Sequence, residues 1–282
     1  MTCMTAAEAY AARVDAVNAQ RARLHGARSR EDRWAERAAY FRRDPLRALD
    51  ENLEIVASYV EAGDVLLDIG GGAGRVSLPL ALRCREVVNV EPSTAMAEQF
   101  VASAHEAGIA NARVVPEAWM DAEGVEGDVV VVANVTYFVR DMVPFVEKLA
   151  AAARRRVMIC VWSVPPPAQN AGLFRCVYGE EQVPVPGHRE LVDVLWEMGI
   201  LPDVRVLPSP FLRRDEMAPA RTREEAVQLA IDQVEAADPA EAARRVERDF
   251  DSLFTTTPDG FRPAWRPDPR EILVTWQTAP MA

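Results

Sequence analysis

Apolar residues occur along this chain as short continuous runs, separated by stretches in which they recur at helical spacing. Continuous runs of about four to eight residues suit strands that are buried on both faces of a sheet. We therefore predict strands at 65–69, 85–90, 112–115, 128–133, 156–162, 203–207 and 271–277. The run at 128–133 is continuously apolar after Asp128, which indicates a central strand.

Helical periodicity fills most of the intervals between these runs. The predicted helices span 46–60, 74–82, 95–108, 142–153 and 190–198, with one or two more within 5–43 and a polar helical pair within 221–254. Pro79 is expected to kink its helix or to lie in the first turns. Prolines between 163 and 189 argue against a long helix there. Strands that alternate with helices are typical of a parallel sheet covered on both faces.

A glycine-rich turn joins the first predicted strand to the helix that follows. It contains Asp68 and glycines at 70, 71, 72 and 74, followed by Arg75. Glycine tolerates positive φ and has no Cβ to keep a ligand away from the backbone. A strand, a glycine turn and a helix in this order direct free backbone N–H groups toward the carboxyl end of the strand, where open α/β sheets bind ligands.

Three nucleotide-type ligands could use such a turn. A phosphate loop needs Gly-Lys-Ser/Thr, which does not follow here. A dinucleotide fingerprint needs a glycine at position 75, which is Arg75. The pattern Asp68-x-Gly70-x-Gly72-x-Gly74 resembles the first motif of class I S-adenosylmethionine-dependent methyltransferases. The alternative is a structural turn in another α/β domain.

The resemblance implies a seven-stranded, mostly parallel, doubly wound α/β sheet. Its last strand, 271–277, would be antiparallel and insert beside 156–162. Residues 46–207 and 268–282 would form the cofactor-binding methyltransferase core. Residues 1–45 would be a helical arm or lid, and 208–267 a helical insertion that caps the substrate.

An acid stands at the end of the second predicted strand. Glu91 lies 23 residues after Asp68, at the position that accepts hydrogen bonds from ribose hydroxyls. A surface glutamate is the alternative, but the Val-Val-x-Val-Glu-Pro context places this one at a strand tip. We therefore expect Glu91 to hold the ribose of S-adenosylmethionine.

The family pattern implies further cofactor contacts around this turn. Those expected beside Glu91 are Asp68, Gly70, Gly71, Gly72, Gly74, Pro92, Ser93, Met96, Glu117, Ala118, Trp119, Asn134 and Val135. The glycines would pack under the methionine part and Met96 on the adenine. Glu117 and Ala118 would meet the adenine edge, although the common acid is Asp and Trp119 is bulkier than usual. Asn134 and Val135 would meet the methionine end.

Few residues stand out for the chemistry itself. Methyl transfer from a sulfonium is an in-line displacement, so positioning supplies most of the rate and a base is needed only if the acceptor loses a proton. No catalytic residue is assigned, and His188 and Tyr137 are the candidates. Tyr137, Trp162 and Tyr178 could form an aromatic wall toward the cation, with His188 near the substrate, or each aromatic residue could belong to the core.

Composition limits the partners. The net charge of −11 argues against a nucleic-acid backbone as the main partner, and no apolar stretch approaches the roughly 20 residues of a membrane helix. Ten arginines between 13 and 47 are expected to lie on a solvated helical face; an anion-binding arm is the alternative. The cysteines, at 3, 84, 160 and 176, lack metal-site spacing and are expected to be free thiols. With Asp141 as the only acid close after the fourth strand, we predict no metal.

The sequence thus predicts an enzyme that methylates a small molecule. A non-catalytic, regulatory S-adenosylmethionine-binding protein is the alternative from another class. A methyltransferase that acts on a macromolecule is disfavoured by the acidic charge. The residues up to 30 lack an apolar signal core, so we expect a cytoplasmic protein. We also expect it to be bacterial, and to be a monomer or a homodimer.

Overall fold

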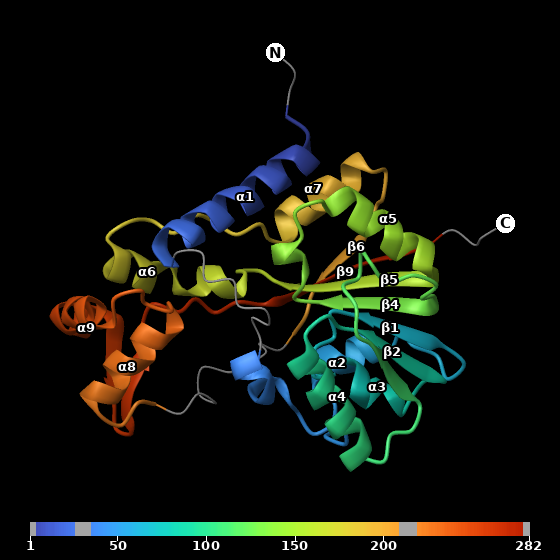
Figure 1. The fold of residues 1–282 in the computed structure, drawn as a ribbon, viewed down its shortest axis with the longest axis horizontal. Coiled ribbons are helices and arrows are strands. Elements are labelled where there is room, and N and C mark those ends of the chain that lie inside the picture. Colours follow the sequence, from blue (N-terminus) through green and yellow to red (C-terminus); the bar gives the residue numbers. More distant parts are fainter. Residues whose placement is uncertain (1–3, 26–34, 209–218, 279–282) are drawn as a thin grey trace.

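The protein is built on one seven-stranded sheet. The computed structural model describes residues 4–25, 35–208 and 219–278. The strand order is β3-β2-β1-β4-β5-β9-β6, and β9 runs antiparallel to both of its neighbours (Figure 1). The strands are β1 (Val65–Ile69), β2 (Glu86–Val90), β3 (Ala112–Val115), β4 (Gly127–Ala133), β5 (Ala153–Trp162), β6 (Asp203–Val206) and β9 (Glu271–Gln277). The predicted fold class is confirmed.

The middle strand, β4, contains four consecutive valines after Asp128. Val129, Val130, Val131 and Val132 are all fully buried, so both faces of this strand are covered. Burial of every side chain requires helices on both sides of the sheet, and the alternating elements supply them. This explains why the strand positions followed so closely from the apolar runs.

Two helical layers cover the sheet. On one face lie α1 (Ala6–His25), α5 (Met142–Ala152) and α7 (His188–Glu197). On the other lie α2 (Glu51–Ala57), α3 (Ser77–Ala81) and α4 (Thr94–Glu106). Figure 1 shows the first group above the sheet and the second below it. The two apolar clusters divide along the same line.

The long N-terminal helix belongs to the first of these layers. Tyr10 and Val14 of α1 are buried in the core of that face, and the Tyr10 hydroxyl donates to the carbonyl of Thr136 at 2.8 Å. An ion pair between Arg13 and Glu190 ties α1 to α7. The helix is therefore part of the core, whereas an arm or lid was expected over residues 1–45. Among the described residues, Ala38 of η1 (Ala35–Phe41) packs against Ala73 of the glycine turn.

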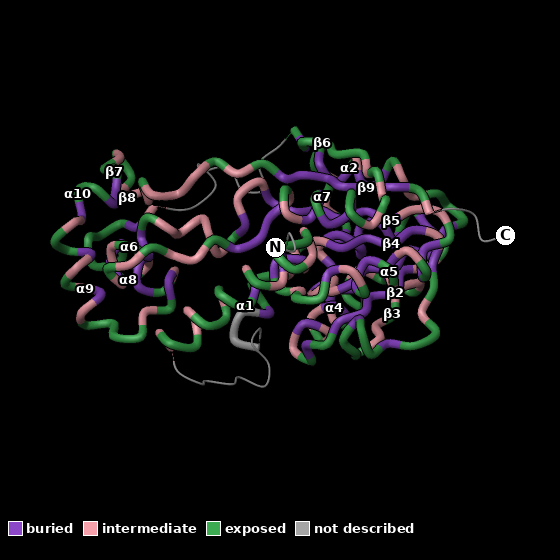
Figure 2. Tube along the Cα trace, turned by 90° about the horizontal axis from the view of Figure 1, so that it is seen from above, coloured by how far each residue is buried: buried purple, intermediate pink, exposed green. Residues whose placement is uncertain are grey.

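A cap with its own apolar core stands beside the sheet. It consists of α6 (Ala171–Tyr178), α8 (Arg223–Gln233), α9 (Pro239–Arg248), α10 (Phe250–Leu253) and the hairpin of β7 (Phe254–Thr257) and β8 (Gly260–Pro263). Leu173, Ala230 and Val246 are fully buried within it. Figure 2 shows buried residues in the sheet and again in this separate unit. The cap thus combines helices of the predicted insertion at 208–267 with α6, which precedes that insertion in the chain and packs in the same cluster.

Two helices, α2 and α3, begin several residues later than predicted. The helix expected over 46–60 begins only at Glu51, because the Asp50 side chain caps it by accepting from the Leu53 N–H at 2.8 Å. In α3, Pro79 occupies the third position. A backbone N–H there would have no partner within the helix, so proline fits without a kink.

Candidate active site

The glycine turn after β1 adopts a conformation that side chains disfavour. Gly70, Gly72 and Gly74 have φ values of 65°, 55° and 80°. A Cβ at Gly70 would lie 2.6 Å from Val135, and one at Gly74 would lie 2.6 Å from both Leu78 and Phe100. At Gly72 the nearest atom would be the Met96 sulfur, at 3.6 Å. Gly70 and Gly74 thus allow close packing of the turn, whereas Gly72 leaves open space.

Two side chains, one from β2 and one from the residue just after it, hold this turn in place. The Glu91 carboxylate accepts from the Gly72 N–H at 2.9 Å and from the Ser93 N–H at 2.8 Å. The Asn89 amide donates to the Gly72 carbonyl at 2.9 Å. Gly72 is therefore held through both of its polar backbone groups. Sequence reasoning missed Asn89; the signal for it was a polar residue inside an otherwise apolar strand, Val87 to Val90.

Asp68 lies directly beneath the turn. Its side chain is fully buried, and a Cβ at Gly71 would fall 2.2 Å from a carboxylate oxygen. Among the described residues, neither of its carboxylate oxygens reaches a donor in hydrogen-bonding geometry. Burial raises the pKa of Asp68 to about 6, while the nearby Ser77 hydroxyl and the charge of Arg75 act in the opposite direction. The carboxyl is thus enclosed beneath the turn rather than open to a ligand.

The start of α4 forms another side of the site. The Ser93 hydroxyl caps this helix by accepting from the Met96 N–H at 3.2 Å. Met96 packs against Ala73 of the turn and Ala38 of η1 in one small apolar cluster. A side chain of Arg47 donates to the Arg75 carbonyl at 2.7 Å. The segment from 38 to 47 therefore runs along the glycine turn.

The residues after β3 divide into two environments. Glu117 and Ala118 are exposed, so a ligand can reach them. Trp119 is buried in the core of the sheet, and the Lys148 ammonium lies 4.9 Å from its ring centroid. The bulk at position 119, unusual for the family pattern, is thus used in packing.

The tips of β4 and β5 are joined by a hydrogen-bonded chain. Asn134 has a positive φ of 63°, and its side-chain oxygen accepts from the Tyr137 hydroxyl at 3.2 Å. The Tyr137 oxygen in turn accepts from the Trp162 N–H at 2.5 Å. Burial raises the pKa of Tyr137, so this hydroxyl stays protonated. Val135, the remaining predicted contact here, faces Gly70.

Four residues were predicted to lie near the acceptor, and the structure does not place all of them side by side: Tyr137, Trp162, Tyr178 and His188. Tyr178 lies in the cap, where its ring packs on Phe174 with centroids 4.6 Å apart. His188 begins α7 and is half-buried, and burial lowers its pKa, helped by the charge of Arg189. Of the four, only Tyr137 and Trp162 are hydrogen-bonded to each other within the described residues.

The described parts of the chain offer no metal centre and no membrane span. No three or more histidine, cysteine, aspartate or glutamate residues are grouped closely enough there to hold a metal ion. No helix in these parts is long and apolar enough to cross a membrane. Cys84, Cys160 and Cys176 are free thiols, and Cys3 lies outside the described residues.

This strand order and the glycine turn after β1 agree with the fold that the resemblance to class I methyltransferases implied. A family model described as a methyltransferase domain matches residues 67–160, from β1 to β5. The segment from β1 to β5 is therefore similar to a methyltransferase domain. No curated protein sequence matches the chain.

Solved structures share the fold at low sequence identity. A putative methyltransferase from Bacillus halodurans matches with a TM-score of 0.53 and 14% identity, over 80% of this chain and 96% of that chain. The YcgJ protein from Bacillus subtilis matches with a TM-score of 0.52 and 15% identity, over 80% and 97%. The [4+2]-cyclase SpnF matches with a TM-score of 0.52 and 16% identity, over 82% and 81%.

Proposed function

We propose that this methyltransferase transfers the methyl group to a small organic acceptor by in-line displacement. The observation that carries the proposal is the cap beside the carboxyl ends of the strands. Two of the segments that connect it to the core leave β5 and enter β9. Ser163 and Arg270 join these segments where they meet, through N–H···O bonds of 2.7 and 2.9 Å.

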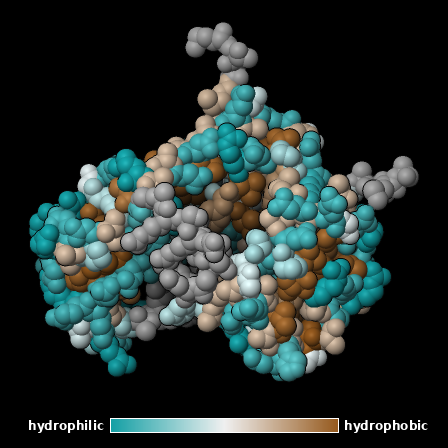
Figure 3. Space-filling model, viewed as in Figure 1, coloured by the Kyte–Doolittle hydropathy of each residue, from teal (hydrophilic) through white to brown (hydrophobic). Residues whose placement is uncertain are grey.

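The space beside the cap suits an organic molecule. Figure 3 shows hydrophobic residues in the recess between the cap and the sheet core. Small-molecule sites are concave and mostly apolar, with a few polar groups that fix orientation. The net charge of −11 makes a nucleic-acid acceptor unfavourable. A monomer or a homodimer remains our expectation for the assembly.

Different residues of the chain would contact different parts of S-adenosylmethionine. Glu91 would hold the ribose, Met96 would pack on the adenine, and the turn at Gly72 would face the methionine end. When bound, S-adenosylmethionine supplies a methyl group already activated by its sulfonium. Tyr137 and Trp162 would shape the wall near that methyl group and exclude water.

A proton acceptor is required only for acceptors that carry a proton. The Tyr137 hydroxyl, with its raised pKa, is suited to donate a hydrogen bond but not to take a proton. His188 has a lowered pKa and is therefore neutral near pH 7, as a general base must be. Its contact with an acceptor remains a prediction.

The test must follow the methyl group itself, because a fold can serve different reactions. The SpnF structure, described as a [4+2]-cyclase, has the same fold. We would incubate the protein with S-adenosylmethionine labelled in its methyl group and with a bacterial metabolite extract. Label in a low-molecular-weight product, absent with a Gly72→Val variant, is the expected result. Label confined to protein or RNA would contradict the proposal, and binding without transfer would favour a regulatory protein.

A further inference from the structure

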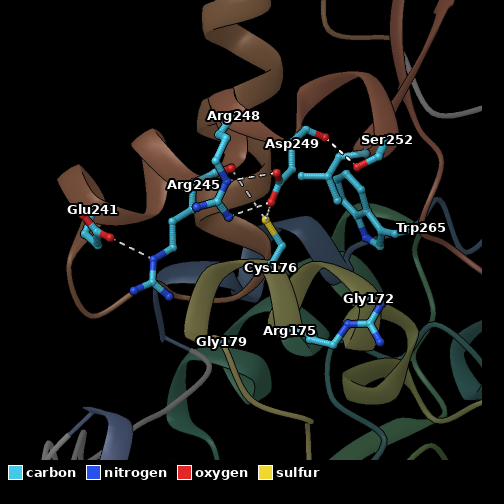
Figure 4. A pocket seen from close by; sticks show the side chains of 11 residues that line it. Gly172, Arg175, Cys176, Gly179, Glu241, Arg245, Arg248, Asp249, Ser252 and Trp265 are labelled. Atoms are coloured by element: carbon cyan, nitrogen blue, oxygen red, sulfur yellow. Dashed lines mark hydrogen bonds and ion pairs between the residues drawn. The ribbon is translucent and has the colours of Figure 1, made fainter.

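A cavity of about 610 Å³ lies inside the cap, between α6, α9 and α10 (Figure 4). Three arginines line it: Arg175 from α6, and Arg245 and Arg248 from α9. The lining includes only two acids, Glu241 and Asp249. The cavity is thus locally cationic in a chain whose net charge is −11.

Each of the three guanidinium groups keeps donor capacity. Arg248 gives two nitrogens to Asp249, at 3.0 and 2.9 Å. Arg245 gives one to Glu241 at 2.8 Å and one to the Val177 carbonyl at 3.0 Å. Within the described residues, each therefore retains a guanidinium nitrogen without a partner, since a guanidinium has three nitrogens.

Arg175 is the least committed of the three. It bonds Glu181 through one nitrogen at 3.2 Å, and these side chains are 68% and 74% exposed. Such an exposed pair contributes little to stability. Arg245 bonds the last turn of α6, so it helps to hold α9 against that helix. Arg245 therefore helps to stabilise the packing of the cap. Arg175 and Arg248 make no such contact between α6 and α9 among the described residues.

The chemistry of these groups indicates the class of ligand. Guanidinium groups present planar forks of N–H donors, which match carboxylate and phosphate oxygens. Arg245 and Arg248 are three residues apart on one helix, so they share a face. Trp265 contributes an aromatic wall on another side of the cavity.

We propose that this cavity is a second ligand site, which binds the oxyanion of a small molecule, a phosphate or a carboxylate group, through Arg175 and Arg248. All of the lining residues belong to the cap, and none of them is in the glycine turn or at the tip of β4. Binding there is therefore independent of which acceptor receives the methyl group.

Cys176 provides a reporter inside the cavity. Its sulfur lies 3.5 Å from the Asp249 carboxylate and the residue is partly exposed. Burial, together with the hydrogen bond to Asp249, raises the pKa of this thiol to about 11. Cys84 and Cys160 are buried, so Cys176 is the described cysteine that a maleimide should reach first. A ligand in the cavity would shield it.

The experiment measures the rate of Cys176 alkylation by mass spectrometry of its peptide, on the full chain without cofactor. Inorganic phosphate and acetate are added separately, with sodium chloride at matched ionic strength as the reference. We expect a saturable decrease in rate, with an apparent Kd on the order of 1 mM. Protection by phosphate alone would identify a phosphorylated ligand, and protection by acetate alone a carboxylate.

Two variants distinguish the site from a general salt effect. Arg175→Gln removes a charge from the lining and should weaken protection severalfold. Arg244→Gln is the matched control, because Arg244 lies on the same α9 helix, is similarly exposed at 69% and does not line the cavity. Protection equal to that in chloride, or unchanged in Arg175→Gln, would overturn the proposal. Neither result depends on methyl transfer, so the site and the proposed activity fail separately.

Discussion

The Glu91 carboxylate accepts a hydrogen bond from the backbone N–H of Gly72 at 2.9 Å, which joins the tip of β2 to the turn after β1. Its other oxygen accepts from the Ser93 N–H, at the start of α4. The acid predicted to hold the ribose thus also holds the two backbone segments that surround the cofactor site. Its loss would affect both binding and the shape of the turn.

Replacing Glu91 with alanine should therefore weaken binding of S-adenosylmethionine. Hydrogen bonds to a charged group contribute about 1.5–3 kcal/mol, so we expect a roughly ten- to hundredfold higher Kd. Calorimetric titration with the cofactor measures it, and circular dichroism checks that the fold persists. Glu98→Ala, an exposed change on α4, is the control. An unchanged Kd in Glu91→Ala would show that the carboxylate has no part in binding.

The glycines of the turn should respond differently to alanine. Gly108→Ala measures the cost of a positive φ alone, because its φ is 68° and a Cβ there meets nothing within 4 Å. That cost is about 1 kcal/mol. Gly74→Ala adds contacts of 2.6 Å with Leu78 and Phe100, so it should lower the unfolding free energy by clearly more than Gly108→Ala does.

Gly72→Ala should match Gly108→Ala in chemical denaturation, since a Cβ there meets only the Met96 sulfur at 3.6 Å. Its effect should instead fall on cofactor affinity, because that Cβ enters the open side of the turn. Equal losses of unfolding free energy in Gly72→Ala and Gly74→Ala would contradict the assignment of Gly74 to packing and Gly72 to cofactor binding.

Much of this site followed from sequence because it depends on local patterns. A buried run of four valines, a glycine turn and an acid at the next strand tip each fill a position that only a few residue types can occupy. Asn89 was missed because one polar residue in a buried strand does not reveal its partner. Only the fold shows that its amide meets the Gly72 carbonyl.

The cap was harder to predict. Prolines between 163 and 189 argued against a long helix, and α6 is indeed short: it ends after two turns at Gly179, which has a φ of 71°. Because α6 was not foreseen, Tyr178 was placed near the acceptor, whereas it packs in the cap. The β7–β8 hairpin had a readable signal, Pro258-Asp259-Gly260, which is typical of a turn. Long-range packing of polar helices leaves no such local pattern.

Asp68 should make stability depend on pH. Its pKa is about 6 in the folded protein, above the ordinary value near 3.9, so the folded state holds this proton more tightly. Stability from this group is full below about pH 4 and is lost as pH rises to about 6. Asp68→Asn should therefore flatten the curve between pH 4 and 7. Denaturant unfolding of both proteins across that range tests it, and parallel curves would contradict it.

The segment around Ala38 should influence how fast the cofactor leaves. Ala38 packs on Ala73 and Met96, beside the predicted adenine position. Ala38→Trp cannot fit this contact, so the segment should lift and cofactor dissociation should accelerate. Ala39→Trp is the control, because Ala39 is exposed. Stopped-flow displacement of S-adenosylmethionine by its demethylated product measures the rate, and equal rates in the two variants would refute a covering role.

Tyr137→Phe should separate a structural role of Tyr137 from a catalytic one. The change removes the hydroxyl between the Trp162 N–H and the Asn134 amide oxygen. The N–H then loses its acceptor in a buried site, and the expected cost is about 1–3 kcal/mol of unfolding free energy. Because the raised pKa keeps this hydroxyl protonated, the pH profile of methyl transfer should keep its shape while the rate falls. Denaturant unfolding and a pH–rate series with the identified acceptor measure both. Loss of an ionisation from the profile would instead make Tyr137 the base, and unchanged stability would show that the bond to Trp162 contributes nothing.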